Sequence, residues 1–197
     1  MGQFEYILVA GPLAGGKTNG VNGLRGPEYA ESLHIPSRFL TRYELPGDDS
    51  HNKHLDVDEF EAGVVDGSIW PHWGRKLDIG DPYPDLYGFD ATIPEDEPQP
   101  DPDERTTVLG INNGFLRASN ESTEAVIPES LIVIMWATVA KREERLIDAG
   151  RRASRSLINL QDDLIRPDAP IKWIDTTGFD EPEEGQAALR EVIDQVI

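Results

Sequence analysis

The feature that most constrains the fold is a short apolar run, residues 4–10, that leads directly into a glycine-rich turn at residues 11–18. A short apolar run that ends at turn residues is typical of a strand buried on both faces. The residues that follow the turn, TNGVNGLRG, are rich in Asn and Gly, which are poor helix formers. We therefore predict a buried strand over 4–10 and, from about Thr18, a helix that is short or frayed.

Further apolar runs alternate with amphipathic segments along the rest of the chain. Strands are predicted at 37–41, 69–73, 106–111, 131–137 and 171–175, and helices at 56–66, 141–149, 154–164 and 184–197. The most apolar of these runs, LIVIMWA, is expected to form a central strand. Strands that alternate with helices favour a parallel sheet built from right-handed crossovers. We predict one domain with a three-layer α/β fold and a central parallel sheet of about five strands.

The turn after the first strand carries a motif with a chemical meaning. Its eight residues fit the pattern G-x-x-x-x-G-K-[ST], and they are Gly11, Pro12, Leu13, Ala14, Gly15, Gly16, Lys17 and Thr18. Glycines let backbone N–H groups surround phosphate oxygens, and the following helix presents its N-terminus to the same anion. Lys17 is expected to reach the β- and γ-phosphates of ATP, and Thr18 to offer its hydroxyl to Mg²⁺. The alternative is a glycine-rich turn that happens to contain Lys-Thr.

Two arginines in a strongly acidic chain suggest a second phosphate site. If residues 37–41 form a strand, Arg38 and Arg42, the residue directly after that strand, share one face, because side chains alternate along a strand. Two guanidinium groups on one face form a fork that suits a phosphate. The alternative is that each arginine pairs with surface carboxylates. His51 and His54 follow closely, and we favour hydrogen bonding to a substrate, or a plain surface position, over metal ligation for them.

The order of residues in this region resembles the guanylate-kinase-like group of P-loop kinases. The resemblance rests on R-x-x-T-R at 38–42, a Gly-acid turn at 47–49, D-E-F at 58–60, Trp73 and Tyr87-Gly88. Ribose 1,5-bisphosphate phosphokinases show the closer likeness. Guanylate kinases carry a second arginine where this chain has Leu45, and an acidic guanine-reading residue where it has Pro71 or His72. The resemblance therefore implies a phosphorylated sugar or a different nucleotide, rather than GMP, as the phosphate acceptor.

The resemblance also implies roles for further residues. An acceptor-binding subdomain would span 35–90 and would hold the acceptor with Arg38, Arg42, His51, His54 and Tyr87. Asn112, in the turn after the predicted strand at 106–111, would add a further contact to the acceptor. A lid at 141–156 would close on the phosphates, and its candidate catalytic arginines are Arg145, Arg151 and Arg152. Adenine would pack near the turn at 173–177. For each lid arginine the alternative is pairing with a neighbouring acid of the helix, such as Glu144.

Composition limits the classes of partner. The chain has 37 acidic against 18 basic residues, a net charge of −19, so we expect neither nucleic acid nor a membrane surface as a partner. Cysteine is absent, which excludes disulfides and a cysteine nucleophile. No basic leader or long apolar segment is present, so a cytoplasmic protein is expected, monomeric or homodimeric. The acidic, proline-rich segment at 90–105 is expected to be an exposed loop.

Three functions remain open from the sequence. The first is a kinase that uses ATP and Mg²⁺ to phosphorylate ribose 1,5-bisphosphate or a similar phosphosugar. The second is a nucleoside monophosphate kinase, including one that prefers deoxynucleotides. The third is a guanylate-kinase-like binding module without catalysis, against which the intact Lys17 and Thr18 argue.

Overall fold

The computed structural model describes residues 4–44, 51–75, 85–91, 105–111, 115, 130–150 and 170–197. The chain divides into two compact units. The first comprises residues 1–35 together with 100–197, and the second comprises residues 36–99. Each unit is considered by itself below.

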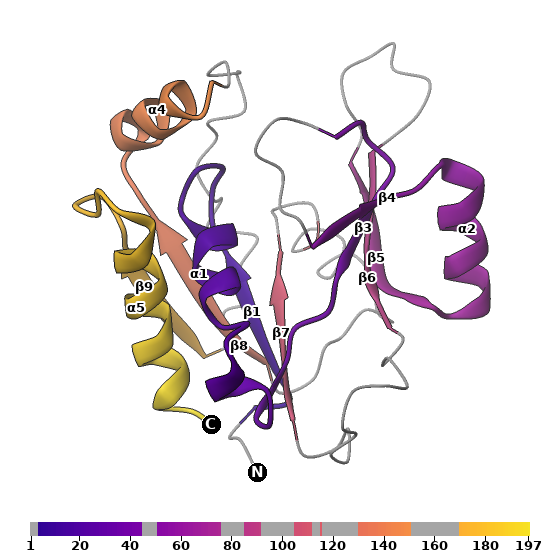
Figure 1. Cartoon of the computed structure of the whole chain (residues 1–197), viewed down its shortest axis with the longest axis horizontal. Helices are drawn as coiled ribbons and strands as arrows, with labels where there is room; N and C mark the ends of the chain where they lie inside the picture. Colours follow the sequence, from indigo (N-terminus) through magenta and orange to yellow (C-terminus); the bar gives the residue numbers. More distant parts are fainter. Residues whose placement is uncertain are drawn as a thin grey trace. The chain divides into compact units, whose positions relative to one another are not determined.

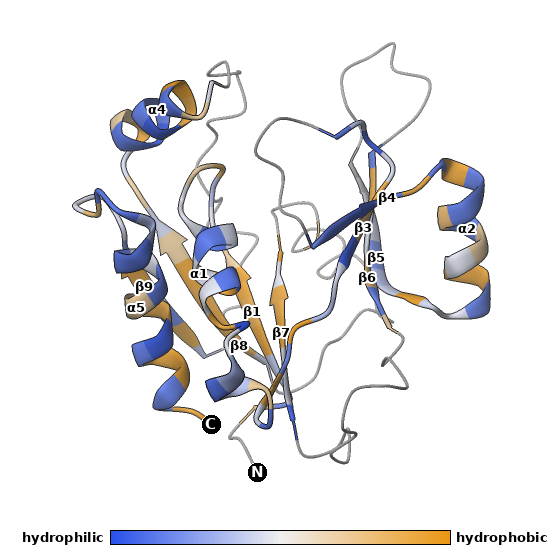
Figure 2. Cartoon of the chain, in the orientation of Figure 1, coloured by the Kyte–Doolittle hydropathy of each residue, from blue (hydrophilic) through white to orange (hydrophobic). Residues whose placement is uncertain are grey.

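A five-stranded sheet forms the centre of the first unit. Its order is β2-β7-β1-β8-β9, and every neighbouring pair is parallel. The strands are β1 (Tyr6–Ala10), β2 (Leu33–His34), β7 (Thr106–Gly110), β8 (Ser130–Trp136) and β9 (Ile171–Asp175). The predicted α/β class with a central parallel sheet of five strands is therefore confirmed. Strands β1 and β8 carry the strongest apolar colouring of this sheet (Figure 2), and Ile7, Val9, Val133 and Met135 are fully buried.

Helices α1 (Lys17–Gly23) and α5 (Pro182–Asp194) lie side by side against one face of this sheet (Figure 1). Leu189 and Ile193 of α5 are fully buried among the side chains of β1 and β8. Glu181 and Glu184 form a capping box that fixes where α5 begins. Among the described residues, this unit also contains the short helices η1 (Pro27–Tyr29) and α4 (Val139–Asp148), the latter capped by Thr138.

The glycines of α1 have a packing role that helix propensity does not show. The helix is short, as predicted, but its glycines stand where neighbouring side chains come very close. A Cβ at Gly20 would lie 2.8 Å from Sδ of Met135, and a Cβ at Gly23 would lie 2.6 Å from Cγ of Gln186 on α5. Residues that weaken the helix in isolation therefore let it approach α5 and β8 closely.

The second unit holds a separate four-stranded sheet in the order β4-β3-β6-β5. The strands are β3 (Arg38–Leu40), β4 (Asn52–His54), β5 (Ile69–Arg75) and β6 (Asp85–Asp90). Strands β3 and β4 are parallel, whereas β6 runs antiparallel to both β3 and β5. The sequence reading placed strands at 37–41 and 69–73 in this unit but missed β4 and β6, and in the first unit it missed β2.

Helix α2 (Val57–Asp66) packs on one face of this second sheet. It begins at a capping box made by Asp56 and Glu59, as its acidic start suggests. Phe60 is buried, and a Cβ at Gly88 of β6 would collide with Cγ2 of Ile69 and touch the ring of Phe60. Gly88 and its neighbours Leu86 and Asp90 therefore face α2, and Tyr87 and Phe89 face the opposite side.

Some predicted elements fall outside the described residues. The predicted helix at 154–164 and nearly all of the acidic segment at 90–105 lie there. Within the part of the chain that the structure describes, no helix is both long and apolar enough to span a bilayer.

Candidate functional site

The turn between β1 and α1 is a compact loop with several residues in the left-handed region. Gly11, Ala14 and Gly16 have φ angles of 142°, 58° and 96°. A Cβ at Gly11 would collide with the carbonyl of Met135 on β8, so only glycine fits there. The amide of Gly15 donates to the carbonyl of Pro12 at 3.2 Å. Successive turns of this kind make the concave backbone that binds anions.

The side chain of Lys17 folds back over this loop. Its Nζ donates to the carbonyl oxygens of Gly11 and Pro12, both at 2.8 Å. An ammonium group held at the loop by neutral carbonyls is placed to exchange them for phosphate oxygens. Thr18, the predicted magnesium ligand, follows it with an exposed side chain.

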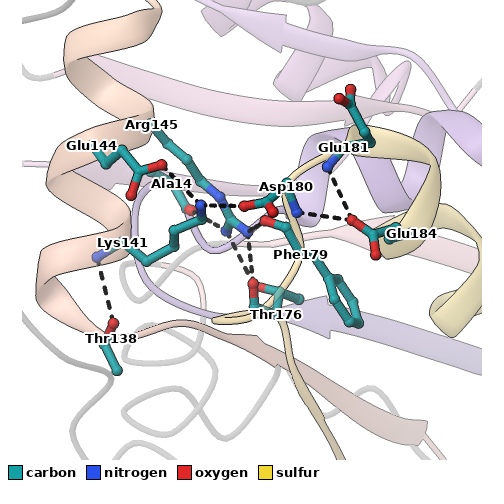
Figure 3. A network of polar contacts seen from close by, with 10 residues as sticks. All are labelled: Ala14, Thr138, Lys141, Glu144, Arg145, Thr176, Phe179, Asp180, Glu181 and Glu184. Atoms are coloured by element: carbon teal, nitrogen blue, oxygen red, sulfur yellow. Dashed lines mark hydrogen bonds and ion pairs between the residues drawn. The ribbon is translucent and has the colours of Figure 1, made fainter.

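Arg145, a predicted lid arginine, reaches the same loop from α4. Its Nη1 donates to the carbonyl of Ala14 and to Oγ1 of Thr176, both at 3.1 Å. Its Nη2 donates to the carbonyls of Thr176 at 2.6 Å and Phe179 at 3.0 Å. Figure 3 shows the guanidinium between the loop and the turn that follows β9. All four of these acceptors are uncharged, and none is one of the acids considered as its partner above.

Thr176 connects three segments of the first unit. It is 1% exposed and comes directly after β9. Its hydroxyl lies 3.1 Å from the carbonyl of Gly15 and 3.0 Å from that of Trp136. Because it accepts from Arg145, its own proton is available for one of these two carbonyls. The phosphate-loop candidate is thus tied to the carboxyl ends of β8 and β9.

Helix α4 is also tied to the turn after β9 by charge (Figure 3). Nζ of Lys141 lies 2.8 Å from Oδ1 of Asp180 and 2.9 Å from Oε1 of Glu144. Hydrogen bonding to Asp180, then to Glu144, raises the pKa of Lys141, and the bond from Lys141 lowers the pKa of Asp180. The amide of Thr138 donates to Oγ1 of Thr177 at 3.1 Å.

The other arginines of the predicted lid region divide into two groups. Arg142 is fully buried and donates from Nε to the carbonyl of Ala137 at 3.1 Å. Burial lowers the pKa of its guanidinium, which nevertheless keeps its charge at neutral pH. Its place is in the core and not at a solvent-facing phosphate. Arg151 and Arg152 lie outside the described residues, and so does Asn112.

In the second unit, one face of the sheet collects several of the predicted acceptor-binding residues. Arg38 pairs with Asn52 on one side and Phe89 on the other, and Leu40 pairs with His54 and Tyr87. Paired residues share a face of a sheet. Arg38, His54 and Tyr87 therefore lie on the face opposite α2, together with Asn52.

Contacts between these side chains agree with the strand register. Nε of Arg38 donates to Oδ1 of Asn52 at 3.1 Å. Trp73 stacks on Tyr87 with ring centroids 5.6 Å apart and an interplanar angle of 11°. Tyr87 is buried, and its hydroxyl donates to Asp85 at 3.3 Å. This face of the sheet thus combines the stacked rings of Trp73 and Tyr87 with the half-buried Arg38.

Arg42 and His51 stand apart from this pattern. Strand β3 ends at Leu40, so alternation along the strand does not place Arg42 on the face of Arg38 as the sequence reading assumed. Nη1 of Arg42 donates to the carbonyl of Tyr43 at 2.9 Å, and the carbonyl of Arg42 lies 2.8 Å from Nδ1 of His54. His51 is exposed, and its carbonyl accepts from the amide of Arg38.

Sequence reasoning missed two residues that the structure places at these sites. Thr176 follows the last strand of a parallel sheet, and ligands of such sheets bind at the carboxyl ends of strands. That rule could have singled it out. Asn52 lies two positions before His54, but it could be assigned to a face only once β4 was known. Among the residues the structure describes, no three His, Asp or Glu side chains gather as a metal site.

Comparisons with known proteins bear on the fold. No protein-family model matches the sequence. A search of curated proteins also gives no match. Among solved structures, a guanylate kinase from Anaplasma phagocytophilum is similar with a TM-score of 0.52 at 15% identity, over 98% of this chain and 86% of that one. The fold is guanylate-kinase-like. At this level of identity the likeness concerns the fold alone, and it agrees with the family resemblance carried by the sequence motifs.

Proposed function

We propose that this protein is an ATP-dependent phosphotransferase that phosphorylates a small phosphorylated acceptor. The observation that carries the proposal is the loop at 11–18, whose lysine ammonium lies on the loop carbonyls at the carboxyl end of a buried parallel strand. A guanylate-kinase-like fold provides the setting in which such a loop serves phosphoryl transfer.

Each residue of the loop has a distinct part in this proposal. Lys17 would leave the carbonyls of Gly11 and Pro12 and bind the β- and γ-phosphates of ATP. The exposed hydroxyl of Thr18, an oxygen ligand of the kind Mg²⁺ prefers, would hold the ion next to those phosphates. Bound Mg²⁺ would neutralise part of the charge that develops on the transferred group. Catalysis would then rest on positioning and charge, without a strong base.

The acceptor is proposed to be ribose 1,5-bisphosphate or a similar phosphosugar. The face that carries Arg38, Asn52 and His54 offers a guanidinium for a phosphate and polar groups for sugar hydroxyls. Arg42 and the exposed His51 are proposed to contribute from beside that face. The sequence departures at Leu45 and His72 support a sugar over guanine. Arg151, Arg152 and Asn112 stay candidates on the resemblance alone.

A second candidate is a nucleoside monophosphate kinase, and the specific observation that favours it is the guanylate kinase among the similar structures. The buried Trp73–Tyr87 stack on the face that carries Arg38 is equally compatible with a flat base. A third candidate, a binding module without catalysis, has the intact Lys17 and Thr18 against it.

The test is Mg²⁺-dependent ADP release from ATP, measured with ribose 1,5-bisphosphate, with ribo- and deoxynucleoside monophosphates, and without acceptor, at low and at molar salt. The proposal predicts turnover with the phosphosugar and none after Lys17→Ala. Lys172→Ala, which removes an exposed lysine of β9, is the matched control and should be fully active. Turnover with nucleotides alone would select the second candidate. Activity that survives Lys17→Ala would contradict the assignment of the loop.

A further inference from the structure

We propose that Arg145 is a positioning residue: together with Thr176 it sets the backbone of the phosphate-binding loop, instead of stabilising charge on the transferred phosphoryl group. The inference rests on the proposed function in that it takes the loop as the ATP site. It departs from the lid role that the resemblance implies for this arginine.

The first argument concerns the hydrogen-bond donors of Arg145. Its two terminal nitrogens carry four N–H groups. Nη1 makes two bonds, to Ala14 and Thr176, and Nη2 makes two bonds, to Thr176 and Phe179. Every terminal N–H is thus matched by an uncharged acceptor within 3.1 Å. To bind a phosphoryl oxygen through the fork, Arg145 would have to release at least one of these acceptors.

The second argument concerns which carbonyls are held. The Ala14 carbonyl belongs to the same peptide unit as the amide of Gly15, and the Gly15 carbonyl to that of Gly16. In a trans peptide the C=O and N–H bonds point in opposite directions. Arg145 holds the first carbonyl and Thr176 lies 3.1 Å from the second. Both carbonyls are therefore drawn towards α4 and β9, and the amides of Gly15 and Gly16 are turned to the other side.

The geometry of the loop itself supports this account. The Gly15 amide points to the carbonyl of Pro12, which also accepts from the ammonium of Lys17. Ala14 has a φ of 58°, a conformation that costs energy for a residue with a Cβ. A strained backbone persists only where its surroundings hold it in place, and the bond from Arg145 to the Ala14 carbonyl does so.

The helix that carries Arg145 is itself held in place by other contacts. Arg145 sits on α4, which the Lys141–Asp180 ion pair and the Thr138–Thr177 hydrogen bond join to the turn after β9. Arg145 contacts that turn at two carbonyls. Helix, turn and loop therefore form one connected set of polar contacts (Figure 3), in which the loop is the part that would meet ATP.

The test compares Arg145→Ala, Arg145→Lys and Thr176→Val with the wild-type protein and with Lys172→Ala as the surface control. The first readout needs no ligand: hydrogen exchange of the Gly15 and Gly16 amides by NMR. Loss of one charged hydrogen bond should speed exchange at Gly15 by about tenfold in both Arg145 variants, because lysine keeps the charge and loses the fork. Thr176→Val should act mainly on Gly16.

The second readout separates positioning from chemistry. We expect Kd and KM for Mg-ATP to rise about 10- to 100-fold in Arg145→Ala, with kcat at saturating ATP within about threefold of wild type. The proposal is overturned if kcat falls while KM for ATP and amide exchange are unchanged, since Arg145 would then act on the reacting phosphoryl group. It is also overturned if amide exchange is unaffected in all three variants. A wild-type protein that binds no Mg-ATP would contradict the proposed function, and the exchange rates would still decide the role of Arg145.

Discussion

Substitution of Gly23 by alanine should change the stability of the protein in two opposite ways, because helix propensity favours alanine whereas packing against α5 favours glycine. Alanine is favoured over glycine in a helix by about 1 kcal/mol, so propensity alone predicts a more stable protein. In the structure the new Cβ would lie 2.6 Å from Cγ and 2.7 Å from Cβ of Gln186. Arg190 of α5 also donates to the Gly23 carbonyl from Nε and Nη2, at 3.0 and 2.6 Å, which fixes the two helices against each other.

The clash is costly because part of it cannot be removed by a rotamer change. Cγ of Gln186 can swing away, but its Cβ is fixed to the backbone of α5. Overpacking of this kind costs about 3 kcal/mol at the upper end of the usual range, so the net loss after the propensity gain is about 2 kcal/mol. The melting temperature of a chain of this size should fall by about 4–8 °C.

Urea unfolding followed by tryptophan fluorescence measures this change. Gly178→Ala is the control, because nothing lies within 4 Å of its would-be Cβ. The Gly178→Ala protein should have the same urea midpoint as the wild type. Adding Gln186→Ala to Gly23→Ala should recover the part of the loss that comes from Cγ and Cδ. A Gly23→Ala protein that is as stable as the wild type, or more stable, would refute the close approach of α1 and α5.

Two further predictions concern polar contacts. Asn52→Ala should raise KM for the acceptor by about 3- to 10-fold at unchanged kcat, because Arg38 loses the partner of its Nε. Steady-state kinetics measures this change, with Lys53→Ala, on the opposite face of the sheet, as the control. Equal kinetic constants for the two variants would contradict the prediction. Asp180→Asn should destabilise the protein at pH 7. Because the folded-state pKa of Asp180 is lowered, the difference in stability between the two proteins should begin to shrink as the pH falls to the ordinary pKa of 3.8, and it should be lost once the pH has fallen through the lowered folded-state pKa. Because the pKa of Lys141 is raised above its ordinary value of 10.5, the lysine stays charged throughout this pH range. Equal urea midpoints for wild type and Asp180→Asn at pH 7 would exclude a stabilising Lys141–Asp180 ion pair.

The first unit could be read from the sequence because its signals are local. Strands β1 and β8 are short apolar runs, whereas β7 and β9 mix apolar with polar residues over five positions each and the two-residue β2 shows neither pattern. The turn that carries Lys17 follows β1 directly. Helices α4 and α5 carry apolar residues at helical spacing and begin at recognisable caps. These signals do not depend on knowing which other segment packs against them.

The second sheet could not be read in the same way. Strand β4 is Asn-Lys-His. Strand β6 begins and ends with an aspartate and has a glycine inside it. Neither therefore shows the apolar run or the regular alternation that is typical of a strand. Both exist because they pair with β3. The face that gathers Arg38, Asn52 and His54 is a consequence of that register.

The roles of single residues were hidden for a related reason. A run of arginines near a predicted lid suggested charge stabilisation for Arg145. Its acceptors, however, lie 31 to 131 positions away in the sequence. The same holds for Arg142, whose position on an otherwise charged helix gave no sign of complete burial. Long-range hydrogen bonds decide the role of Arg145, and packing in the folded protein decides the burial of Arg142; no local sequence pattern contains either.

The most direct test of the central claim is a calorimetric titration of Mg-ATP into the wild-type protein, Lys17→Ala and Lys172→Ala. The account predicts that wild type and Lys172→Ala bind one equivalent of Mg-ATP with the same affinity. Lys17→Ala should bind it about 10- to 100-fold more weakly, because the ammonium that lies on the Gly11 and Pro12 carbonyls is the group that meets the phosphates. Equal affinities for all three proteins, or no binding by the wild type, would contradict it.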